Sequence, residues 1–263
     1  MNKISIVVVT YNNADVINDC IAALLSAIDK LVFTAQLLII DNKSDDATIA
    51  ALQAYVHDDR IKVIENKTNR GFGAGHNIGL SQADSCYHII CNPDIVINDT
   101  AIGILADYMG QHPDIGILCP KLLNADGSLQ ANNHREPNIL DLALRRLAPI
   151  WLKKRLKKRM DAYIMLDVGY EHSYEVPFVS GAFMFCRTDV LKKVGGFDER
   201  YFLYFEDADL SRKVRQQGYR TVYCPDASVV HQWGRAAHKS LPMAFVLVES
   251  AVKYFNKWGY RLY

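Results

Sequence analysis

Short apolar runs alternate with amphipathic stretches along the first half of the sequence. The runs that predict strands occupy 4–9, 36–40, 61–64, 87–91 and 116–119. Between them, apolar residues recur at helical spacing in 16–28, 46–56, 75–83 and 100–109. Strands that alternate with helices form βαβ units, so we predict an α/β fold with a mostly parallel central sheet flanked by helices.

Polar side chains follow three of these predicted strands. Tyr11 comes after the first strand, Asp41 ends the second, and Asp94 follows the fourth. In open α/β sheets, ligands bind outside the carboxyl ends of the strands. We therefore expect these three side chains to share one crevice.

The composition is that of a soluble globular enzyme. The chain has 263 residues, of which 50% are hydrophobic and 22% charged, and its net charge is +1. This balance provides no global field for nucleic acid, so no nucleic-acid partner is expected. None of the six cysteines lies in a Cys-x-x-Cys pair, which favours reduced thiols in a cytoplasmic protein. No run of 18 apolar residues occurs, and no transmembrane helix is expected.

The second half of the sequence contains a compact acidic segment behind aromatic residues. Phe202, Tyr204 and Phe205 precede the carboxylates of Glu206, Asp207 and Asp209. An apolar wall raises the pKa of a neighbouring carboxylate and makes it a better base. The alternative is an acidic first turn of a helix, because 210–217 has helical character and early acids suit the helix dipole. Further strands are expected at 176–186 and 221–224, and a helix at 242–257.

A glycine-rich loop at 69–79 follows the third predicted strand. Gly71, Gly73 and Gly75 alternate, but His76 stands where a dinucleotide fingerprint requires glycine. Such a loop, opening a helix, offers backbone N–H groups to a phosphate or a sugar. The alternative is a tight connection that needs positive φ angles.

Several other polar residues suit the binding of a nucleotide and its metal ion. Asp41 can accept the imide N–H of a uracil or thymine ring, and Ser44 or Asp45 can cap the next helix. Asp94, behind the Asn92-Pro93 turn, suits coordination of Mg²⁺ or Mn²⁺ that bridges a diphosphate, and turn formation alone is the alternative. Two histidines could assist. His231 could be an additional metal ligand, and the alternative is a histidine bonded within the core. His238 could contact the diphosphate, and the alternative is a surface residue.

Five motifs in order resemble glycosyltransferase family 2, and within it the rhamnosyltransferase-like members that build bacterial O-antigen and other surface polysaccharides. The motifs lie at 8–12, 40–46, 69–77, 92–94 and 196–210. The resemblance runs from about residue 4 to residue 231. It implies a GT-A fold with a nucleotide-sugar-binding half at 1–120, an acceptor-binding and catalytic half at 121–240, and a C-terminal helix at 241–263.

The resemblance also implies roles for individual residues. Asp207 would be the catalytic base of an inverting transfer, and Asp94 and His231 would hold Mg²⁺ or Mn²⁺. Tyr11 and Asp41 would contact the base and ribose. Further substrate contacts would come from Thr10, Asn12, Asn69, Gly71, Phe72, Gly73, Asn77, Asn92, Pro93, Gly181, Glu206 and His238. The chain departs from many members in having Asn92 where they have the first Asp of an Asp-x-Asp motif.

The expected reaction moves rhamnose from dTDP-rhamnose to a polyprenyl-diphosphate-linked glycan. Galactose, glucose or an N-acetylhexosamine from a UDP donor is the alternative sugar. A nucleotide-sugar pyrophosphorylase is disfavoured, because the first strand runs into Thr10-Tyr11-Asn12 and not into a glycine-rich loop with Arg and Lys. A non-catalytic membrane-associated scaffold is the alternative of another class, and a homodimer stays open.

A basic segment suggests where the protein works. Residues 145–159 contain eight Lys and Arg and no acid, and 149–160 reads as one amphipathic helix with Trp151 beside Leu152, Leu156 and Met160. Tryptophan among dense basic residues is typical of a helix on an anionic membrane. The alternative is a solvated basic face. We expect a cytoplasmic protein bound peripherally to the inner face of the cell membrane.

Overall fold

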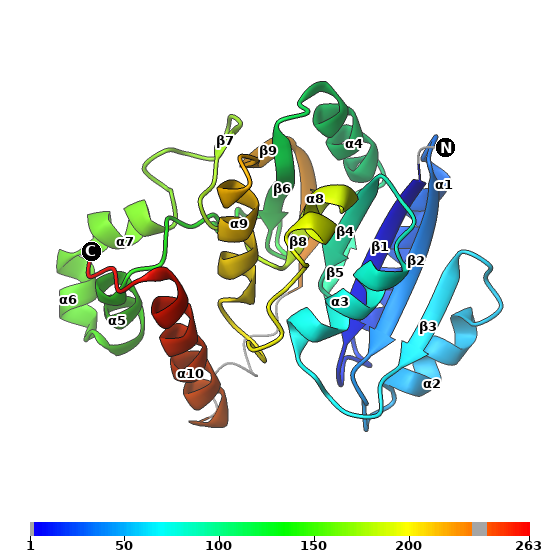
Figure 1. The fold of residues 1–263 in the computed structure, drawn as a ribbon, viewed down its shortest axis with the longest axis horizontal. Helices are drawn as coiled ribbons and strands as arrows, with labels where there is room; N and C mark the ends of the chain where they lie inside the picture. The colour runs from blue at the N-terminus through cyan, green and yellow to red at the C-terminus, as the bar shows by residue number, and fades with distance from the viewer. Residues whose placement is uncertain (1–2, 233–240) are drawn as a thin grey trace.

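The computed structural model describes residues 3–232 and 241–263 of the chain. The described strands form one sheet in the order β3-β2-β1-β4-β8-β6-β9-β5, and β7 pairs with β9 at one side (Figure 1). The strands are β1 (Lys3–Thr10), β2 (Thr34–Asp41), β3 (Ile61–Glu65), β4 (Tyr87–Cys91), β5 (Ile95–Ile97), β6 (Ile115–Leu123), β7 (Tyr174–Glu175), β8 (Phe183–Arg187) and β9 (Arg220–His231). The helices are α1 (Ile17–Asp29), α2 (Thr48–Leu52), α3 (Phe72–Gln82), α4 (Ala101–Gln111), α5 (Ile139–Leu147), α6 (Ile150–Arg155), α7 (Lys157–Tyr163), α8 (Thr188–Lys193), α9 (Glu206–Gln216) and α10 (Leu241–Trp258), with a 3₁₀ turn at Gln53–Tyr55.

The predicted parallel sheet is confirmed for the first half of the chain. Strands β3, β2, β1 and β4 run parallel to one another. In the second half, β8 runs antiparallel between β4 and β6, while β9 is parallel to β6 and antiparallel to β5. The sheet is therefore mixed but mostly parallel along the half that carries the first four motifs.

Both faces of the sheet are covered by helices. Alternate residues of β1 face opposite sides: Ile6 packs with α1 and α4 in the largest core cluster, and Val7 packs on the other side with Ile78 of α3. Helices α8 and α9 cover that second side farther along the sheet, around Met184 of β8. Burial on both faces explains why the strands lack a polar alternation.

Two predicted elements are corrected by the structure. The single amphipathic helix at 149–160 is wrong, because the backbone turns out of helical geometry at Leu156 and separates α6 from α7. The strand expected at 176–186 shrinks to β8. Its first part bonds to two different neighbours, since Val176 N–H donates to Thr221 and Phe178 N–H donates to His134. In addition, no strand was predicted at 95–97, where the structure has the three-residue strand β5.

The C-terminal helix packs against the acidic segment. Tyr254 and Phe255 of α10 form a small aromatic cluster with Tyr201 and Phe205, which precede α9. In Figure 1, α10 (red-brown) lies beside α5 and below α9. The helix expected at 242–257 is thereby confirmed, and the end of the chain lies near the segment that precedes α9.

The glycine-rich loop contacts the loop that precedes α9. Phe72 N–H donates to the Phe202 carbonyl oxygen at 3.1 Å. Gly71 has a φ of +86°, and a Cβ atom there would lie 2.2 Å from that carbonyl oxygen. Only glycine fits, because it has no Cβ and adopts positive φ without strain.

We predict that Gly71→Ala lowers the free energy of unfolding by about 3 kcal/mol, since it adds both backbone strain and a collision. Gly127→Ala is the matched control: Gly127 has a φ of +80° with no atom near its Cβ position. That control should lose only about 1 kcal/mol, the cost of the backbone strain. Urea denaturation measures both, and equal losses would show that the contact with Phe202 is unimportant.

Candidate active site

Three neighbouring parallel strands end at one edge of the sheet. Thr10 at the end of β1 pairs with Asp41 at the end of β2, and Asn42 N–H donates to the Thr10 carbonyl oxygen at 2.8 Å. Strand β4 lies on the other side of β1, and Asp94 follows its end. The expected gathering of these strand ends is confirmed. Tyr11 remains 45% exposed and so is accessible to a ligand.

Asp41 is buried and held by its own loop. Its Oδ2 accepts from Ser44 N–H at 2.8 Å, and its Oδ1 accepts from the Ser44 hydroxyl at 2.5 Å. The hydroxyl oxygen of Ser44 also accepts from Asn12 N–H at 2.9 Å. The expected capping of the next helix by Ser44 or Asp45 is therefore wrong: α2 begins at Thr48, whose N–H donates to Asp46. Ser44 orients Asp41 instead.

Asn42 is a site residue that sequence reasoning missed. Its side-chain N–H donates to the Gly71 carbonyl oxygen at 3.0 Å, and its Oδ1 accepts from Asn66 at 2.8 Å. The residue is buried at the end of β2 and ties this edge to the glycine-rich loop. Its position directly after Asp41, at a predicted strand end, was the available signal.

Asp94 and His231 lie together because β5 pairs with β9. Ile95 is opposite His231 in this antiparallel pair, and Asp94 Oδ1 lies 3.3 Å from His231 Nε2. The other ring nitrogen of His231 lies 2.7 Å from the side-chain oxygen of Gln130, a second residue that the sequence did not reveal. This contact turns the Nε2 atom toward Asp94.

This pair fits one part of a divalent-cation site. Oδ1 of Asp94 is buried and accepts no hydrogen bond from residues 3–232 or 241–263, so among these residues it is available as a ligand atom for a cation. A carboxylate oxygen and an imidazole nitrogen suit Mn²⁺, and the carboxylate also suits Mg²⁺. Among the described residues no group of three potential ligands occurs, so a cation here would need oxygen atoms from its substrate. Asn92 and Pro93 form the turn between β4 and β5.

Asp207 lies in the first turn of α9, which begins at Glu206 and not at Leu210 as the sequence suggested. Its Oδ2 accepts from Gly181 N–H at 3.0 Å, and its Oδ1 accepts from Ala208 N–H at 2.9 Å. Burial raises the pKa of Asp207 to about 6, although the two N–H groups oppose the shift. The acidic helix start proposed as the alternative is also present, with three acids in this turn.

Glu206 is buried beside Asp207. Its Oε2 accepts no hydrogen bond. Burial, and then the neighbouring Asp207 carboxylate, raise the pKa of Glu206 well above its usual value. The two neighbouring carboxyl groups therefore titrate as an interacting pair.

The backbone directly before these acids is strained. Tyr204 and Phe205 have φ angles of 70° and 66°, in the left-handed region that non-glycine residues avoid. Each costs about 1–2 kcal/mol, so the surrounding contacts must hold the turn.

The glycine-rich loop and Asp207 meet at Gly181. A Cβ atom on Gly181 would lie 3.1 Å from the Phe72 ring and 3.4 Å from Asp207 Cβ. The absence of a side chain leaves Gly181 N–H free to reach the Asp207 carboxylate. Gly181 therefore brings the glycine-rich loop and the acidic turn into contact.

Other residues of the glycine-rich loop, which were predicted to contact the substrate, form contacts within the protein. Asn77 bonds twice to the backbone of Phe197, at 2.8 and 2.9 Å, and Asn69 Oδ1 accepts from Gly71 N–H at 2.9 Å. Gly73 packs on the Phe197 side chain. These contacts fasten the loop to the segment before α9, and substrate contacts from Asn69, Gly73 and Asn77 stay predictions. His238 lies outside the described residues.

Comparison with known proteins identifies related chains. Residues 2–249 match the family model "Glycosyltransferase like family 2". The N-acetylglucosaminyl-diphospho-decaprenol L-rhamnosyltransferase of Mycobacterium tuberculosis is 28% identical over 86% of this chain and 75% of its own length. The O-antigen chain rhamnosyltransferase RfbN of Salmonella typhimurium is 24% identical over 87% of this chain and 66% of its own length.

A solved structure shows the same fold. The mannosyltransferase PcManGT from Pyrobaculum calidifontis, in complex with GDP-Man and Mn²⁺, superposes with a TM-score of 0.65 and 18% identity. The match covers 96% of this chain and 64% of that protein.

Proposed function

The chain belongs to glycosyltransferase-like family 2, has the GT-A fold and is a glycosyltransferase, and from this premise we propose its substrates and mechanism. It moves a sugar, with inversion, from a nucleotide-diphospho-sugar to a lipid-linked glycan in O-antigen or related surface-polysaccharide synthesis. The favoured donor is dTDP-rhamnose, because relatives named as rhamnosyltransferases align over most of this chain. A UDP donor of galactose, glucose or an N-acetylhexosamine is the second candidate.

The observation that carries this proposal is the Asp207 carboxylate beside Gly181 and the glycine-rich loop. A single displacement requires one base and no protein nucleophile. Asp207 takes the proton of the acceptor hydroxyl as its oxygen forms a bond to the anomeric carbon. The bond from that carbon to the diphosphate oxygen breaks, and the diphosphate leaves with the electron pair.

The donor is assigned to the strand ends. Asp41 and Tyr11 contact the base and ribose, with Asp41 oriented by Ser44. Asp94 and His231 would hold the divalent cation. When bound, Mg²⁺ or Mn²⁺ supplies positive charge to the leaving diphosphate. A scaffold without activity is disfavoured, because such a protein would not need the ionisable groups at 94 and 207.

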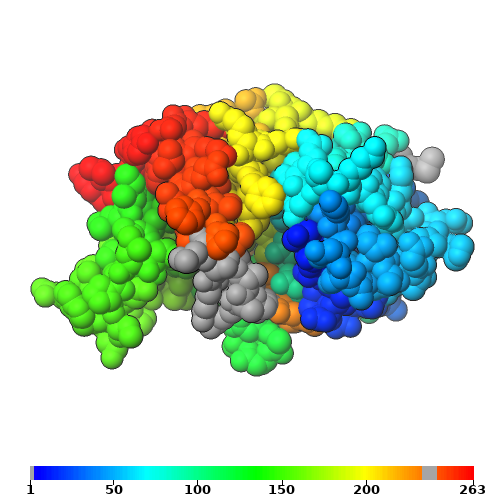
Figure 2. Space-filling model, turned by 90° about the horizontal axis from the view of Figure 1, so that it is seen from below, coloured from blue at the N-terminus to red at the C-terminus, as the bar shows by residue number. Residues whose placement is uncertain are grey.

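A membrane-facing surface suits a polyprenyl-linked acceptor. The basic segment presents apolar side chains to solvent: Leu147 is 82% exposed, Ile150 75% and Trp151 65%. Figure 2 shows this part of the chain (green) projecting at one end of the molecule, next to the C-terminal helix. Exposed apolar groups among basic ones fit an anionic membrane surface. None of the helices in 3–232 or 241–263 has the length and apolar character needed to cross a bilayer.

We predict that Asp207→Asn lowers the rate of transfer by about 100-fold or more and leaves donor affinity unchanged, because asparagine keeps the shape but cannot accept the proton. Asp189→Asn is the matched control and should retain full activity, because Asp189 occupies the same second position of α8 and is exposed. A variant at Asp207 that kept more than about a tenth of the rate would exclude it as the base.

The same assignment fixes the pH dependence. The base acts only when ionised, and the pKa of Asp207 is raised to about 6. The rate of wild-type transfer should therefore fall as the pH drops below about 6 and level off above it.

We predict that a chelator suppresses transfer and that Mg²⁺ or Mn²⁺ restores it. Asp94→Asn should weaken donor binding in calorimetry when metal is present and leave metal-free binding unchanged. Asp99→Asn, just beyond β5, serves as the control that should bind normally. Undiminished turnover in excess chelator would rule out a metal requirement.

We predict that the protein binds vesicles containing anionic lipid and that binding falls as salt rises. The variant Lys154→Glu, Arg155→Glu, Lys158→Glu should remain in solution, since each basic residue near the surface contributes about 1 kcal/mol. The control Lys30→Glu, Lys62→Glu, Lys67→Glu makes the same change in net charge at other exposed positions. Equal sedimentation of both variants with the vesicles would show that the basic segment is only a solvated face.

A further inference from the structure

We propose that the end of α10 is a positioning element for catalysis: Lys257 and Trp258 hold Asp209, and through it the first turn of α9, so that Asp207 stays aimed at the acceptor hydroxyl. This inference rests on the proposed function in one respect, the role of Asp207 as the base. Asp209, Lys257 and Trp258 are positioning residues and touch no substrate.

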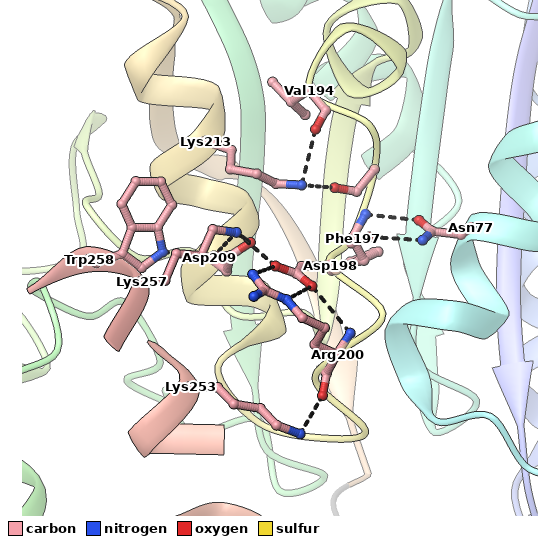
Figure 3. A network of polar contacts seen from close by, with 11 residues as sticks. Asn77, Val194, Phe197, Asp198, Arg200, Asp209, Lys213, Lys253, Lys257 and Trp258 are labelled. Carbon is pink, nitrogen blue, oxygen red and sulfur yellow. Dashed lines mark hydrogen bonds and ion pairs between the residues drawn. The ribbon is translucent and has the colours of Figure 1, made fainter. Parts of the chain in front are cut away.

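Asp209 is fully buried and receives its hydrogen bonds from α10. Lys257 Nζ lies 2.7 Å from Oδ1 and 3.0 Å from Oδ2, and Trp258 Nε1–H donates to Oδ1 at 2.7 Å (Figure 3). A buried carboxylate without such partners would be strongly unfavourable. The pairing therefore fixes where α9 begins relative to α10.

The orientation of the first turn makes this contact relevant to Asp207. Residues two apart in a helix point to nearly opposite sides. Asp207 points to Gly181, next to the sheet, and Asp209 points to α10. The turn is thus held by Gly181 on one side and by α10 on the other, and loss of the α10 contacts removes one of these two supports.

Lys257 also joins the two ends of the segment 198–209. Its Nζ lies 2.9 Å from Asp198 Oδ2, and Arg200 binds the same carboxylate at 2.6 and 2.9 Å. The hydrogen bonds from Arg200 and then Lys257 lower the pKa of Asp198, which keeps it ionised. One lysine therefore neutralises part of the charge on two carboxylates, at the start and at the end of the segment.

Two hydrogen bonds and one aromatic contact from α10 also hold the strained turn. Lys253 Nζ donates to the Arg200 carbonyl oxygen at 2.6 Å, and Ser250 Oγ donates to the Leu203 carbonyl oxygen at 2.8 Å. The ring of Phe205 packs on Tyr254 at a centroid distance of 5.4 Å. The left-handed backbone before Asp207 thus lies directly on α10, which supplies the contacts that such a conformation requires.

The test compares Lys257→Met, Trp258→Phe and the conservative Lys257→Arg. We expect Lys257→Met and Trp258→Phe to lower kcat about tenfold or more, with the KM for the nucleotide-sugar within about twofold, because a small misplacement of a reacting group is costly while the donor site lies elsewhere. Lys257→Arg, which keeps the positive charge, should retain most of the wild-type kcat. Asn256→Ala, an exposed neighbour on α10, is the control.

A second measurement does not depend on activity. Hydrogen exchange should be faster in peptides that cover 204–209 in Lys257→Met than in wild type, with exchange in α1 unchanged. The inference is overturned if that exchange is unaltered, if Lys257→Met keeps its full kcat, or if Lys257→Arg fails to rescue it. A wild-type protein that transfers no sugar from any nucleotide donor would refute the proposed function alone, and the exchange result would still decide this inference.

Discussion

The hydrogen bond from Gly181 N–H to the Asp207 carboxylate joins the two parts of the site. Gly181 lies just before β8, the strand that inserts between β4 and β6. Asp207 lies in the first turn of α9, a helix that packs on one face of the sheet. Phe72, from the glycine-rich loop, lies against Gly181 on the other side. If this contact were absent, the strand ends that suit a donor and the carboxylate that suits an acceptor would be separate features.

Much of this arrangement follows from the sequence, and the reason is local. The strands around Ile6 and Ile39 are buried on both faces, so each is a continuous apolar run in the sequence, and the ends of these runs locate the strand ends. Asp41 and Asp94 were placed by a rule about parallel strands, which needs only the order of elements. The motif around Asp207 was also readable, because its carboxylates and aromatic residues are consecutive.

The parts that the sequence did not reveal depend on contacts between distant residues. Gln130 meets His231 only because β9 pairs with β6 and β5, and Gln130 carries no local signal. The short β8 reflects hydrogen bonds of Val176 and Phe178 to two different neighbours, which override a plausible strand period. The helical spacing of apolar residues continues through the break at Leu156 and so did not reveal it. Ser44 illustrates a subtler error: its type suits a helix cap, yet its hydroxyl donates to Asp41 and its oxygen accepts from Asn12 N–H, so both are used in the loop before α2.

The position of β8 also bears on how the chain folds. Strand β4 can pair with β1 on one edge as soon as both strands are synthesised. Its other edge pairs with β8, which is synthesised almost a hundred residues later. Until then a nascent chain exposes the apolar, unpaired backbone of 87–91, which is the kind of edge that recruits other chains. Pairing over such long separations also slows folding, because the loop must close before the contacts form. The same strand that brings Gly181 to Asp207 therefore makes synthesis the stage at which this protein is most exposed to aggregation.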